Sequence, residues 1–207
     1  MMISRLARIL LALAVLTLTV PAPGQAARIS PREGLELLRS AFAGVNDFTA
    51  EITQEKQIAL MKKKLVTNGM VRFRKPDSFM MELNPPHASR VLLRDNVIST
   101  LLPADGVRQK IVLPPDEGLA RWFALMEKPV TSLPDGVAVQ AERNGDAVTI
   151  SIAPSQGRGV KNLQVILAAD GKLRRVIIEE QNRDRTVISF RNVRRNVGLT
   201  DRDFRIE

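Results

Sequence analysis

The 207-residue chain contains no cysteine, no tyrosine, one histidine and one tryptophan. Without cysteine there is no thiol nucleophile, no disulfide framework and no acylated N-terminal cysteine. A lone histidine, His87, cannot supply the imidazole pair of a metal set, and the GxSxG, Walker and dinucleotide-binding patterns are missing. A carboxylate pair for glycoside hydrolysis stays open, but no pattern selects two of the 22 acidic residues. The sequence therefore predicts a protein that is not an enzyme and uses no cofactor or metal.

Aromatic residues are also scarce, at 4% of the chain, while Lys and Arg outnumber Asp and Glu by 31 to 22. The basic residues are spread along the whole chain and do not interleave with aromatic ones. Recognition of RNA or of single strands uses such interleaving, because bases stack on aromatic rings. We therefore expect no nucleic-acid partner. A basic surface suits anionic lipid headgroups equally well.

The first 26 residues have the pattern of a secretory signal peptide. Arg5 and Arg8 give a positive start, an apolar run from Ile9 to Val20 follows, and small residues precede an expected cleavage after Ala26. The run is too short to span a bilayer well. We expect residues 27–207 to form one soluble domain after export.

The stretch from Gly69 to Pro86 has the pattern of a β-hairpin with a Lys-Pro-Asp turn. Apolar residues alternate on both sides of the turn, so each strand places one apolar row on the same face of a sheet: Val71, Phe73, Phe79, Met81 and Leu83. The opposite face is expected to carry Arg72, Arg74, Met80 and Glu82. Any antiparallel sheet packed on a core gives this pattern, so by itself it indicates a half-buried hairpin.

The remaining chain adds an N-terminal helix and many short strands. Ser30, Pro31 and Glu33 form a capping box ahead of an apolar helical stripe. Strand patterns then recur between turn signals such as Asn144-Gly145, and the last strand is expected at Phe204–Ile206. We predict an α+β fold, an incomplete, half-open antiparallel β-barrel of about ten strands around a hydrophobic interior.

One segment breaks the β pattern. With Asp116 as its N-cap, apolar residues fall at helical spacing at Leu119, Trp122, Phe123 and Met126. Prolines on both sides isolate this segment. Two interpretations stay open: a helix that caps one end of the sheet, or a lid whose adaptable Met and Trp surface covers an apolar ligand.

Three groups of residues carry a family resemblance over nearly the whole mature chain: Phe48-x-Ala-x-Ile-x-Gln54, Gly69-x-Val-x-Phe-x-Lys-Pro-Asp-x-Phe79, and Asp170-Gly171 with Thr186 to Phe190. In this order they resemble the periplasmic outer-membrane lipoprotein carrier proteins of LolA type. The resemblance implies a half-open barrel closed by helices over a hydrophobic cavity. It also implies a periplasmic monomer that takes acylated cargo from an inner-membrane exporter to an outer-membrane receptor.

Under this resemblance the cavity that binds acyl chains is expected to be lined by Phe73, Phe79, Met81, Leu93, Leu101, Leu119, Trp122, Phe123 and Met126. Lys75 stands where the family commonly has an arginine that ties the strand to the lid. We expect Lys75 to act as the lid latch by donating to acceptors on the lid. A lysine keeps the charge but lacks the planar fork of a guanidinium.

The sequence leaves alternatives open for the cargo and for the class of function. Each buried acyl methylene is worth about 0.8 kcal/mol, so a multi-acylated lipid does not cross water unaided. The cargo can be a lipoprotein or another lipid, such as a glycolipid or a polyisoprenoid. The alternative from a different class is a periplasmic lipid-binding sensor or scaffold that does not transport.

Overall fold

The computed structural model describes residues 27–114, 119–155 and 159–206. The signal peptide predicted for residues 1–26 and the N-cap predicted at Asp116 lie outside these ranges. The described residues form one antiparallel sheet of twelve strands in the order β1-β8-β9-β10-β11-β12-β2-β3-β4-β5-β6-β7. The strands are β1 (Ala27–Ile29), β2 (Asp47–Ile58), β3 (Lys63–Arg74), β4 (Ser78–Leu83), β5 (Ser89–Arg94), β6 (Val97–Leu102), β7 (Val107–Val112), β8 (Val137–Asn144), β9 (Ala147–Pro154), β10 (Val160–Ala168), β11 (Leu173–Glu180) and β12 (Arg185–Arg195).

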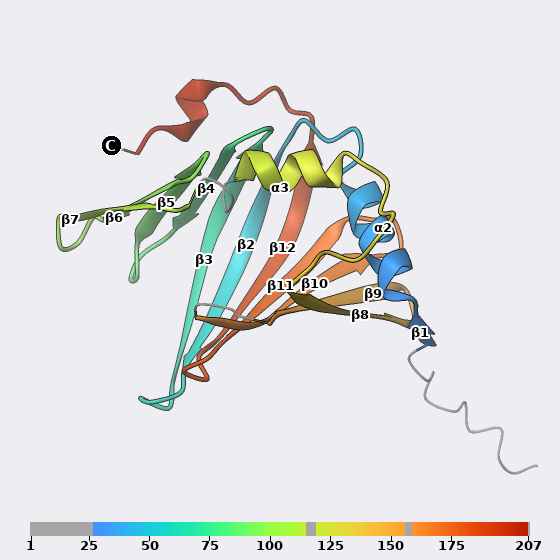
Figure 1. The fold of residues 1–207 in the computed structure, drawn as a ribbon. Coiled ribbons are helices and arrows are strands. Elements are labelled where there is room, and N and C mark those ends of the chain that lie inside the picture. The colour runs from blue at the N-terminus through green and yellow to red at the C-terminus, as the bar shows by residue number, and fades with distance from the viewer. Residues whose placement is uncertain (1–26, 115–118, 156–158, 207) are drawn as a thin grey trace, which may run out of the picture.

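The sheet is strongly curved but not closed, because its edge strands β1 and β7 do not pair within the described part of the chain. Figure 1 shows two helices, α2 (Pro31–Ala41) and α3 (Leu119–Met126), on the inner side of the curve. The predicted incomplete antiparallel barrel is confirmed. The described sheet has twelve strands where about ten were expected, and the short β1 is one that the sequence pattern did not indicate.

Helix α2 begins where the capping residues predict. The Ser30 hydroxyl accepts a hydrogen bond from the Glu33 amide, and Pro31 occupies the first helical position. The helix packs its apolar stripe on β8, β9 and β10, with Leu38 only 2% exposed. A Cβ on Gly34 would lie 2.3 Å from the Ala141 Cβ, so only glycine permits this close approach of helix and sheet.

A second apolar cluster lies on the inner face beside the first. It is built from alternate residues of β2, β3 and β4 together with Phe123 of α3. Cross-strand pairing joins Phe48 to Phe73, Phe73 to Phe79 and Phe79 to Leu93, so these four side chains form one row across the strands.

The outer face of β4 and β5 is covered by the C-terminal segment. The strand expected at Phe204–Ile206 is wrong: a 3-10 turn, η2 (Asp201–Phe204), forms there instead. The Asp203 carboxylate accepts from the Thr200 amide at 2.7 Å, which caps the turn and ends any extended pairing. Phe204 is thereby buried against Met80 and Leu92, two apolar residues of the otherwise polar outer face.

Candidate functional site

Helix α3 presses one ring into an aromatic cluster on the inner face of the sheet. The Phe123 ring is 5% exposed, and its centroid lies 4.7 Å from that of Phe73 and 6.3 Å from that of Phe42. Phe48 completes the cluster at 5.2 Å from Phe73. We call these four rings, Phe42, Phe48, Phe73 and Phe123, the aromatic cluster. They come from the end of α2, from β2, from β3 and from α3.

The first end of the α3 segment is attached to the turn between β5 and β6. The Asn96 side-chain amide donates to the Leu113 carbonyl at 2.8 Å, and the Leu113 amide donates to the Asn96 carbonyl at 2.7 Å. The Leu119 amide, in the first turn of α3, donates to the Asp95 carbonyl at 3.1 Å. These bonds fix where the segment leaves the sheet.

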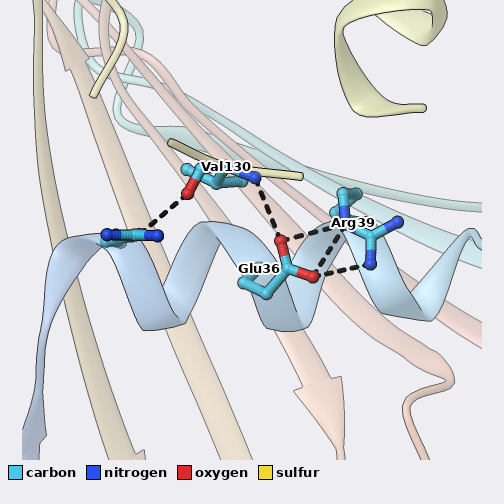
Figure 2. Close-up of polar contacts among 4 residues, drawn as sticks. Glu36, Arg39 and Val130 are labelled. Carbon is cyan, nitrogen blue, oxygen red and sulfur yellow. Dashed lines mark hydrogen bonds and ion pairs between the residues drawn. The ribbon is translucent and has the colours of Figure 1, made fainter. Parts of the chain in front are cut away.

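The second end is held by α2 through the backbone of one residue, Val130. Arg32 Nε donates to the Val130 carbonyl at 2.8 Å, and the Val130 amide donates to Glu36 Oε2 at 3.2 Å. Figure 2 shows Glu36 between Val130 and Arg39, which donates to Glu36 through Nε at 2.8 Å. The Arg39 guanidinium, with a further contribution from the Val130 amide, lowers the pKa of Glu36 below its ordinary value. We call Arg32, Glu36 and Val130 the clamp.

Lys75 lies between both helices at the turn from β3 to β4. Its ammonium donates to the Phe42 carbonyl at the C-cap of α2, with 3.4 Å between Nζ and O. The C-terminus of a helix carries partial negative charge and so favours a cation there. Nζ also lies 5.8 Å from the centroid of the Phe123 ring. The acceptor is therefore on α2, whereas the sequence prediction put it on the lid segment, and the contact with α3 is to a ring.

The structure brings most of the predicted cavity residues to one place. Phe73, Phe79 and Leu93 share the inner-face row, Met81 and Leu119 pack against the same cluster, and Phe123 lies in it. The side chains of Trp122 and Met126 lie outside what the structure describes.

Leu101 is the exception among the predicted residues. It pairs with Arg90, and Arg90 pairs with Glu82, so Leu101 lies on the outer face. There it lines the same pocket as Ile206 of the C-terminal segment. Its prediction as an inner-face residue is wrong because β6 has apolar residues on both faces, which leaves the period-two pattern ambiguous.

Several residues of this site were not found from the sequence. The sequence pattern places Phe42 in a helical stripe and Phe48 in a strand, and it assigns neither to the cavity. The clamp joins residues 94 and 98 positions apart, and no local pattern indicates such a contact. The two aromatic residues could have been found, because each occurs next to an element boundary on the predicted buried face.

The described residues contain no group of His, Asp and Glu side chains that could hold a metal ion. None of the described helices has the length and apolar character needed to cross a membrane.

Comparison with known proteins gives one family and several solved structures. No curated protein matches the chain. An uncharacterized conserved protein from Thermus thermophilus has the same fold, with a TM-score of 0.52 and 12% identity over 86% of this chain and 95% of that one. A LolA superfamily protein from Nitrosomonas europaea has a TM-score of 0.45, with 11% identity over 86% of this chain and 98% of its own. The Mycobacterium tuberculosis lipoprotein LppX has a TM-score of 0.42, with 12% identity over 82% of this chain and 97% of its own.

The family model described as outer membrane lipoprotein carrier protein LolA matches residues 43–207. This range begins just after α2 and includes three rings of the aromatic cluster (Phe48, Phe73 and Phe123), α3 and the C-terminal segment. The chain belongs to the outer membrane lipoprotein carrier protein LolA family.

Proposed function

We propose that this protein is a periplasmic carrier that takes the acyl chains of lipoproteins between α3 and the inner face of the sheet. It then shuttles them from the inner to the outer membrane. The observation that carries the proposal is the position of Phe123, a side chain from a short, end-attached helix that fills the aromatic cluster. An acyl chain can take the place of this ring.

The energies of this exchange are comparable. Burying a phenylalanine side chain is worth roughly 1.5–3 kcal/mol, and each acyl methylene about 0.8 kcal/mol. Two to four methylenes, a rough count from the same values, therefore offset the removal of the Phe123 ring. The remaining methylenes of a longer chain then favour the loaded state. A carrier that closes on its own ring keeps its apolar surface out of water when empty.

The attachments at both ends allow α3 to act as a lid. The bonds at Asn96 and the clamp at Val130 lie outside the helix, so they can stay in place while the helix lifts and the Leu119 amide, which belongs to the helix, leaves the Asp95 carbonyl. Lys75 contacts α2 and the Phe123 ring together, which fits a weak latch that holds the closed state.

The route of the cargo follows from where the protein acts. The signal peptide expected at residues 1–26 would export it to the periplasm, where no ATP is available. Loading would therefore depend on an inner-membrane exporter, and unloading on an outer-membrane receptor that binds the cargo more tightly. The carrier would act as a monomer.

Intrinsic fluorescence tests the lid assignment, because Trp122 in α3 is the only tryptophan and there is no tyrosine. Adding an acylated ligand should shift the Trp122 emission, and brominated acyl chains should quench it by contact. Unchanged emission at saturating ligand, with binding shown independently, would mean that cargo does not enter beneath α3.

The cargo is identified by mass spectrometry of what co-purifies with the protein from the periplasm. Triacylated lipopeptides support the lipoprotein carrier. A glycolipid or polyisoprenoid would instead assign another lipid to the same site. Protein that recovers no lipid and exchanges none between vesicles would favour the sensor or scaffold.

A further inference from the structure

The hairpin between β2 and β3 ends in an exposed apolar tip. Leu60 is 95% exposed and Met61 is 62% exposed, and they are adjacent in the turn. Figure 1 shows this long hairpin projecting past the neighbouring strands, at the end of the sheet away from α3. Single exposed apolar side chains are common on protein surfaces, but two together on a projecting turn indicate a contact surface.

Lysines surround the two apolar residues. Lys62, Lys63 and Lys64 follow directly, and Lys56 lies on β2 opposite Leu65. Lys64 pairs with Glu55 at 2.6 Å. Within the part of the chain that the structure describes, no ion pair involves Lys62 or Lys63. The tip therefore combines two exposed apolar side chains with neighbouring positively charged lysines.

The turn is held in a defined shape. Ile58 and Lys63 are the last pair of the β2–β3 ladder, and the Lys62 amide donates to the Ala59 carbonyl at 3.3 Å. The Asp184 carboxylate, on the turn between β11 and β12, accepts from the Ala59 amide at 2.9 Å. The exposure of Leu60 is thus a property of an ordered turn. An ordered tip loses little conformational entropy when it binds.

We propose that this tip, comprising Leu60, Met61, Lys62 and Lys63, docks the protein on the surface of an anionic lipid bilayer. Leu60 and Met61 enter the boundary between headgroups and acyl chains, and the lysines bind lipid phosphates. Lysine is depleted in protein–protein interfaces but is attracted to anionic leaflets, so the charge of the tip favours a bilayer over a protein partner. This contact goes beyond the proposed carriage of cargo and does not depend on it.

A single fluorescent label tests the insertion, because the chain has no cysteine. Leu60→Cys carrying the dye NBD should shift to the blue and brighten with vesicles containing phosphatidylglycerol, and should not respond to pure phosphatidylcholine. Val112→Cys on the edge strand β7 is the matched control, since Val112 is also exposed, at 66%. An equal response at both positions would show that the vesicles do not contact the tip specifically, and would overturn the proposal. No response at position 60 would also overturn it and would leave a protein as the partner of the tip.

Charge variants test the lysines of the tip by vesicle co-sedimentation at low salt. Each lysine near an anionic leaflet strengthens binding about fivefold, so Lys62→Asn with Lys63→Gln should weaken it about 25-fold. Asparagine is chosen because Lys62 has a φ of 49°, which asparagine tolerates. Arg108→Gln with Lys110→Gln on the exposed β7 removes the same charge elsewhere and should change binding about twofold or less. Equal losses in both pairs would show a general charge effect and reject the tip as the docking site.

Discussion

The two helices on the inner face are attached to the sheet in different ways. Helix α2 packs so closely on β8 that a Cβ on Gly34 would have no room. Leu38 of this helix is 2% exposed, and Ile150 of the sheet beneath it is 0% exposed. Helix α3 is shorter, and its described contacts with the inner-face cluster are through Leu119 and Phe123. The difference shows that α2 belongs to the core, whereas α3 is attached at its ends, and under the proposed function α3 is the element that leaves the sheet.

The largest effect on stability is expected beneath α2. Leu38→Ala should lower the free energy of unfolding by about 2–5 kcal/mol, because it opens a cavity that the close-packed helix cannot collapse. Phe123→Ala should cost less, although the side chain is larger, because α3 can move to release the strain. Urea unfolding of both variants makes the comparison. A greater loss for Phe123→Ala would place α3 in the permanent core.

The next effect concerns uptake of ligand. Phe123→Ala removes the ring that occupies the aromatic cluster, so a fluorescent fatty acid should enter about tenfold faster, corresponding to roughly half of the burial energy of the ring. Phe204→Ala is the control, because Phe204 is also buried, at 1% exposed, but on the outer face. Stopped-flow mixing measures the rate. If both variants take up ligand at the wild-type rate, Phe123 does not compete with cargo.

A smaller effect is expected at the contact that joins the two helices. Lys75→Leu removes the donor to the Phe42 carbonyl and the cation near the Phe123 ring, two contacts that hold the closed, empty state, so uptake of ligand should become about two- to fivefold faster, as expected for roughly 0.5–1 kcal/mol. Lys75→Arg keeps the charge and adds donors, and should slow uptake. Stopped-flow uptake rates of a fluorescent fatty acid distinguish these variants. Equal rates for all three proteins would reduce Lys75 to a surface charge of the turn.

The parts of the fold that the sequence could predict are those that depend on residues close together in the chain. Examples are the cap at Ser30, the turn at Asn144-Gly145 and the hairpin around Lys75. Local chemistry decides them, and the structure has each of them as expected. The inner-face row of Phe73 and Phe79 follows equally from period-two alternation.

Contacts between distant segments could not be predicted in this way. Met80 was expected on the polar face and does lie there, yet it is 2% exposed because the C-terminal Phe204 covers it. The pairing of two apolar residues, Met80 and Leu92, on an otherwise polar face is the sequence signal that could have indicated a covering segment. The clamp at Val130 has no comparable signal, because its bonds to the α3 segment are made to a backbone amide and carbonyl.

The smallest expected effect is a pH dependence at the clamp. Hydrogen bonds from Arg39 and from the Val130 amide stabilise the charged form of Glu36 and lower its pKa in the folded state. A group whose pKa is lowered on folding contributes stability above its unfolded pKa and loses it as the pH falls through the lower folded value. The clamp should therefore be intact at neutral pH and weaken only below the ordinary pKa range of glutamate, when protonation removes the charged acceptor for the Val130 amide.

Nuclear magnetic resonance can follow this step at the Val130 amide itself. Its nitrogen shift should titrate with an apparent pKa below the ordinary glutamate value, and its hydrogen exchange, corrected for the intrinsic pH dependence, should speed up over the same range. Glu36→Gln is the matched control, since it keeps an oxygen acceptor but cannot ionise, so the titration should vanish while the amide stays partly protected. The exposure of Glu36 keeps the effect on overall unfolding small, because solvent screens exposed ion pairs. A Val130 amide that titrates at or above the ordinary glutamate value would mean that the Glu36 carboxylate does not hold this end of α3.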